Sequence, residues 1–89
     1  MPGPPARRPR PMSDPATLDR AACLDEQISF ALRTAAAVHE EHGNADAAAS
    51  LREQARLHSL RATRLRALSE VRSAEAAEVV AVVVARQGA

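Results

Sequence analysis

The sequence predicts an all-α protein, an antiparallel two-helix hairpin that dimerises into a four-helix bundle. Two long alanine-rich segments carry apolar residues at helical spacing, and His42-Gly43-Asn44 separates them. Aromatic residues are nearly absent, with one Phe and no Tyr or Trp. The first two observations predict the hairpin. The third predicts a thin core that needs a partner for stability.

Residues 1–13 form a segment rich in proline and arginine. Because proline disfavours both helix interiors and central strands, we expect a disordered tail here. The tail either binds a partner or is an inert segment, and translation starts at Met1 or at Met12. Its basic residues are Arg7, Arg8 and Arg10.

The first helix is predicted over residues 14–42. Asp14 is a good N-cap residue, and Pro15 suits the first helical position because no partner is needed for its missing N–H. Spacings of three and four residues then predict a heptad seam, and Leu18 and Leu32 widen this face. The seam consists of Ala21, Leu24, Ile28, Ala31, Ala35 and Val38.

The turn is predicted at Gly43, since glycine adopts the left-handed conformation that ends many helices. Asn44 is a good N-cap for the next helix, and Asp46 falls in its first turn, where a negative charge is favourable. A helix end followed at once by a helix start leaves almost no loop. The two helices must therefore fold back on each other.

The second helix, predicted over residues 45–72, has two apolar stripes on roughly opposite sides. One stripe consists of Leu51, Ala55, His58, Ala62 and Leu65. The other consists of Leu57, Leu60, Ala67, Leu68 and Val71. A helix with two apolar sides contacts two neighbours. We expect the first helix on one side and, on the other, either a further segment of the chain or a second copy, so the second stripe is the predicted partner-binding surface.

His58 interrupts an otherwise apolar stripe and is therefore a candidate pH-sensitive interface residue. Protonation near pH 6 would place a charge in that interface, so we expect assembly to weaken in acid.

Residues 73–86 are predicted to be helical, either continuing the second helix or forming a short third one, with a frayed end over residues 87–89. The valine-rich run at residues 79–84 would also suit a strand. Because the chain offers no second strand to pair with it, the alternative is an intermolecular strand.

The span from Leu32 to Leu60 resembles a single tetratricopeptide repeat. Ala36, Ala48 and Ala55 have the spacing of the small residues at that family's helix crossings, and Gly43 lies in the turn. The proline that closes the family's repeat is replaced by Leu60, and no second repeat follows. The resemblance implies a helical hairpin in a protein-interaction module.

No segment of the chain carries a recognisable catalytic, cofactor-binding or phosphate-binding motif. His39 and His42 lack the further ligands that a metal site needs. No apolar run is long enough for a membrane span, and we expect a cytoplasmic location. We therefore expect a non-enzymatic interaction or adaptor module without cofactor, metal or small-molecule substrate.

A nucleic-acid-binding regulator is the alternative function. The net charge is only +1, but acidic residues predominate in the first helix and arginine in the second. Opposite charges favour pairing of the two helices, and arginine also contacts phosphates. The candidate contacts are Arg7, Arg8, Arg10, Arg61 and Arg64.

Overall fold

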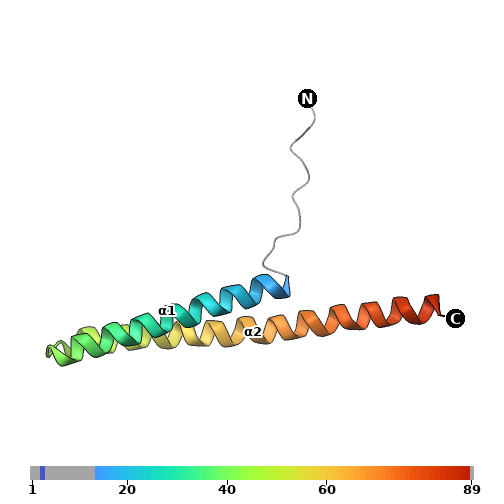
Figure 1. Ribbon diagram of the computed structural model, residues 1–89. Coiled ribbons are helices and arrows are strands. Elements are labelled where there is room, and N and C mark those ends of the chain that lie inside the picture. The colour runs from blue at the N-terminus through green and yellow to red at the C-terminus, as the bar shows by residue number, and fades with distance from the viewer. Residues whose placement is uncertain (1–2, 4–13, 89) are drawn as a thin grey trace.

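Two helices packed as an antiparallel hairpin make up the computed structural model, which describes residue 3 and residues 14–88 (Figure 1). Helix α1 spans Pro15–Glu41 and helix α2 spans Ala45–Gln87. No strand occurs in this described part of the chain. The predicted all-α hairpin is therefore confirmed. The predicted tail lies outside the described residues, apart from Gly3, which is exposed.

The turn has the conformation that the glycine predicts. Gly43 has a φ of +78° and is the only described residue with a positive φ. Its N–H donates to the carbonyl of Glu40 at 3.0 Å, and the N–H of Asn44 donates to the carbonyl of His39 at 2.8 Å. These two bonds satisfy carbonyl groups at the end of α1 and reverse the chain within three residues.

The predicted side-chain caps do not form. Asp14 and Asn44 occupy the N-cap positions of α1 and α2, but neither side chain makes a capping hydrogen bond. The amide nitrogen of Asn44 instead lies 3.4 Å from Nδ1 of His39. The backbone carbonyl of each residue still accepts the first helical bond, from Leu18 at 2.9 Å and from Ala48 at 3.0 Å.

The face of α2 that packs on α1 matches the first predicted stripe. Its centre is a row of small buried residues at intervals of seven, Ala48, Ala55, Ala62 and Ser69. Leu51, His58 and Leu65 flank this row and are half-buried. Side chains this small let the two helix backbones approach closely along the seam.

The seam of α1 is rotated by one position from the predicted one. Its fully buried residues are Leu18, Ala22, Asp25, Ser29 and Ala36. Leu24 and Val38, placed in the predicted seam, are 57% and 50% exposed. The prediction was wrong because it excluded two polar residues. Both are accommodated between the helices because α2 supplies hydrogen-bond partners for them.

Residues 73–87 continue α2 without a break, so the structure contains neither a third helix nor a strand in this described segment. Helix α2 is 43 residues long, whereas α1 has 27. The C-terminal part of α2 therefore projects past the start of α1 (Figure 1). We call residues 70–87 the overhang.

Candidate functional site: the two edges of the hairpin

One edge of the hairpin is polar. It is formed by side chains that recur every seven residues on both helices, and we call this set the polar edge. Arg66 donates two hydrogen bonds to the carboxylate of Glu26, at 2.7 and 3.0 Å. Arg33 donates to the hydroxyl of Ser59 at 3.0 Å, and Arg52 pairs with Glu40. Hydrogen bonding from Arg66 lowers the pKa of Glu26.

Between the helices lies a carboxylate that the sequence did not single out. Asp25 is only 4% exposed. Its Oδ1 lies 2.9 Å from Nδ1 of His58, and its Oδ2 lies 3.4 Å from Nε of Arg61. Among the described residues Oδ2 has no hydrogen-bond partner. The buried carboxylate therefore faces two side chains of α2, Arg61, which is cationic, and His58, which carries a charge only when protonated.

This contact changes the physical basis of the proposed pH sensitivity. His58 is half-buried in the interface between α1 and α2 of one chain, facing Asp25 and close to Arg61. A protonated His58 would meet a carboxylate rather than apolar surroundings. Weakening of assembly in acid stays a prediction.

Ser29 is the second buried polar residue of α1, with 1% of its surface exposed. Its hydroxyl lies 2.9 Å from the carbonyl oxygen of Ala55 and 2.7 Å from the hydroxyl of Ser59. Because the hydroxyl donates to a backbone carbonyl across the interface, it fixes the register of one helix against the other. No local pattern predicts this role, since both partners lie on α2.

The second stripe of α2 is exposed, as expected of a surface without a neighbour in the chain. The exposed fractions are 53% for Leu57, 39% for Leu60, 40% for Leu68 and 53% for Val71. Ala67 is also exposed. Single exposed apolar residues are ordinary, but a row at helical spacing indicates an unpartnered face.

The exposed leucine and valine of α1 lie on the same edge as this stripe. Leu24 precedes the buried Asp25 by one residue and so lies on the flank of α1 opposite Glu26. Leu68 precedes the buried Ser69 and lies on the flank of α2 opposite Arg66. The Glu26–Arg66 ion pair joins the flanks of α1 and α2 on which those two residues lie. The opposite flanks, which carry Leu24 and Leu68, therefore also lie side by side.

We call this second edge the apolar edge. It consists of Leu24 and Val38 of α1 with Leu57, Leu60, Ala67, Leu68 and Val71 of α2. The sequence predicted the α2 residues of this surface. It did not predict the α1 residues as part of the surface, because they were placed in the seam.

Most arginines of α2 already have carboxylate partners. Arg56 pairs with Glu53 and Arg72 with Glu75, both within α2, in addition to the pairs of the polar edge. Of the two predicted nucleic-acid contacts in α2, Arg61 faces Asp25, whereas Arg64 is exposed and has no ion pair among the described residues. Arg7, Arg8 and Arg10 lie outside the described residues.

Two kinds of feature are absent from the described residues. No group of three or more His, Cys, Asp or Glu side chains in them could hold a metal ion. Neither described helix combines the length and apolar character that crossing a membrane requires.

Comparisons of the chain with protein-family models, with curated proteins and with solved structures found no match. The resemblance to a tetratricopeptide repeat therefore stays a prediction. Its three small residues, Ala36, Ala48 and Ala55, are fully buried where α1 and α2 pack together.

Proposed function

We propose that this protein is a small non-enzymatic interaction module whose apolar edge packs against another helical surface. The observation that carries the proposal is the row of exposed leucine and valine side chains on that edge, 39–57% exposed and spread over both helices. Fully burying one such side chain contributes about 1.5–3 kcal/mol. Covering several of them would add substantially to the stability of a hairpin whose seam is mostly alanine.

The first partner to consider is a second copy of the chain. Two hairpins that pack edge to edge would form a four-helix bundle, with each apolar edge buried against the other. The polar edge would face solvent in that arrangement. A helix of another protein with a matching apolar face would satisfy the same surface, which is the adaptor form of the proposal.

Nucleic-acid binding is less well supported as the function of the described part of the chain. Five of the arginines of α2 are matched by carboxylates of α1 or α2, namely Arg52, Arg56, Arg61, Arg66 and Arg72. A surface that binds phosphates needs arginines that are free to make those contacts.

The test replaces two leucines of the apolar edge, Leu60→Asp together with Leu68→Asp. We expect the molar mass from light scattering on a gel-filtration column to fall while circular dichroism still reports a helical chain. The matched control, Ala49→Asp with Thr63→Asp, adds the same charge at exposed positions of α2 outside the apolar edge and should leave the mass unchanged. Equal masses for the leucine variant and the unaltered oligomer would contradict self-association through the apolar edge.

A further inference from the structure

The overhang is the part of α2 that α1 does not cover. The hydroxyl of Ser69 donates to the carbonyl of Pro15, the first residue of α1, at 3.2 Å. Every residue from 70 to 87 is exposed. At 1.5 Å per residue, the overhang projects about 27 Å beyond that contact (Figure 1).

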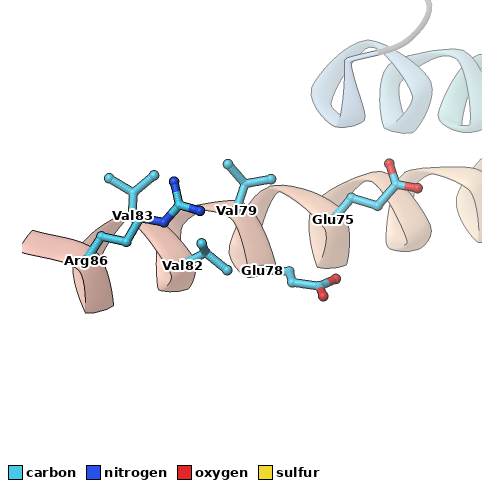
Figure 2. Close-up of a pocket in the computed structure, with 6 residues that line it drawn as sticks. All are labelled: Glu75, Glu78, Val79, Val82, Val83 and Arg86. Carbon is cyan, nitrogen blue, oxygen red and sulfur yellow. The ribbon is translucent and has the colours of Figure 1, made fainter.

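The face of α2 that packs on α1 continues into the overhang. The row of small buried residues ends at Ser69, and the next positions at intervals of seven are Ala76 and Val83. Val79 stands fourteen residues after the half-buried Leu65. Figure 2 shows Val79 and Val83 on the side of the helix toward which α1 lies. Apart from Arg72, which stands seven residues after Leu65, the heptad pattern that buries one helix against another therefore continues beyond the part of α2 that α1 covers.

A shallow groove runs from this face onto the adjoining flank of α2, with Val79 and Val83 toward α1 and Glu78 directed away from it (Figure 2). Val79 is 63% exposed, Val82 49% and Val83 47%. Glu75 and Glu78 lie at the end nearer α1, and Arg86 lies at the other. Arg86 follows Glu75 by eleven residues, which is three helical turns, so the two residues lie on the same face of the helix. Glu78 and Arg86 have no ion pair among the described residues, whereas Glu75 pairs with Arg72 of the same helix at 3.3 Å.

We propose that the overhang binds the overhang of a second copy of this chain, with the two helices antiparallel. Val79 of each copy then lies opposite Val83 of the other, and Arg86 of each lies beside Glu75 of the other. The apolar centre is buried and both charged ends are matched. A parallel pair would instead bring glutamate against glutamate and arginine against arginine, which is unfavourable.

The lengths of the two helices fit this arrangement. In an antiparallel pair with Val79 opposite Val83, the end of the second copy's helix lies near residue 75. Helix α1 begins at Pro15, which contacts Ser69, so α1 and the incoming helix occupy successive parts of one face without overlap. Each copy thereby completes the seam that the other leaves open.

This contact is separate from the apolar edge. It uses residues 75–86, further along α2 than the apolar edge, which ends at Val71. Glu75 and Glu78 lie seven residues after Leu68 and Val71 and so continue the flank of that edge. Pairing through the overhang therefore leaves the apolar edge of each copy free. Either surface could fail its test without affecting the other.

The experiment is disulfide cross-linking in the full chain, with Cys23→Ser removing the exposed native thiol. A chain with Val79→Cys is mixed with a tagged chain that carries Val83→Cys and oxidised mildly. We expect the mixed dimer to exceed the two homodimers together on a non-reducing gel. Homodimers in excess would show parallel pairing, and an absence of cross-linking at micromolar concentration would show no pairing. Either result would overturn the proposal.

Reversing the charges of Glu75 and Arg86 in both cysteine variants tests whether these two residues pair between the copies. Glu75→Arg or Arg86→Glu alone should reduce the yield of mixed dimer roughly three- to tenfold, because each places like charges together at both ends. The two changes combined should restore the yield to within about twofold of the parent. Glu70→Arg, which makes the same charge change off the groove, should leave the yield unchanged. A double variant as weak as either single variant would overturn the antiparallel arrangement.

Discussion

The covered part of α2, residues 45–69, and the overhang, residues 70–87, continue one heptad pattern with different side chains. The covered row is alanine and serine, which α1 approaches closely. The overhang carries Val79 and Val83 on the same face, and all of its residues are exposed. One face of α2 therefore presents small side chains where a helix of the same chain covers it and larger ones where it is uncovered, and the larger ones are those that the proposed pairing of two overhangs would bury.

The largest loss of stability should come from weakening the packing of α1 on α2 near the start of α1. Leu18 is 1% exposed and lies in the first turn of α1, near the end of the covered face. Leu18→Ala should lower the free energy of unfolding by about 2–5 kcal/mol, because it deletes buried apolar volume. Urea unfolding followed by circular dichroism measures the loss.

Leu24→Ala is the matched control for that experiment, since the same side chain is 57% exposed there. Its effect in a dilute sample should stay within about 0.5 kcal/mol. Similar losses for the two variants would contradict the rotated seam of α1.

An intermediate change should come from enlarging one small residue of the seam. Ala55 is fully buried, and its carbonyl accepts the Ser29 hydroxyl. Ala55→Leu should cost about 1–3 kcal/mol, because the closely packed helices must separate to admit the larger side chain. Thermal unfolding at low protein concentration gives the comparison.

Ala76→Leu makes the same substitution at the equivalent heptad position of the overhang. The residue there is exposed, so the melting temperature of a dilute sample should hardly change. If Ala76→Leu destabilised the chain as much as Ala55→Leu, the overhang would be packed against another helix as closely as residues 45–69 are.

The smallest change in stability should come from removing the ion pair between Glu26 of α1 and Arg66 of α2. The pKa of Glu26 is lowered by Arg66, so the pair's contribution to stability is present above the ordinary pKa of a glutamate. It is lost as the pH falls through the lowered pKa of the folded state. Glu26→Gln should therefore be less stable than the parent at pH 7, and the difference should vanish in acid.

Glu70→Gln serves as the control, because Glu70 lies in the overhang and has no ion pair among the described residues. Its difference from the parent should vary little with pH. A difference for Glu26→Gln that grew in acid would contradict the assigned contact.

The sequence predicted those features of the fold that depend on local pattern. Gly43 predicted the turn because only its backbone conformation was required. The spacing of Leu51, Ala55 and Ala62 predicted the packed face of α2, since those residues are small or apolar. The helical state of residues 73–86 followed from the lack of a second strand in the chain, whereas the choice between a continued helix and a short third one did not.

The position of the α1 seam could not be predicted in the same way. Asp25 and Ser29 lie in the interface because His58 and the carbonyl of Ala55 face them from the other helix. Until the register of the two helices is known, a carboxylate and a hydroxyl are assigned to a solvated face. The apolar alternative containing Leu24 and Val38 is equally periodic, so periodicity alone does not decide between the two.

The position of the turn also determines how the hairpin responds to tension. Pro15 and Ser69 meet at the end of the hairpin opposite Gly43, so the first residue of α1 and the overhang leave from one end. A pull applied across the hairpin, to Pro15 and Ser69, would peel α1 away layer by layer, from Leu18 towards Gly43. Unzipping loads one layer of contacts at a time, whereas shear loads all of them together, so the hairpin should open at low force.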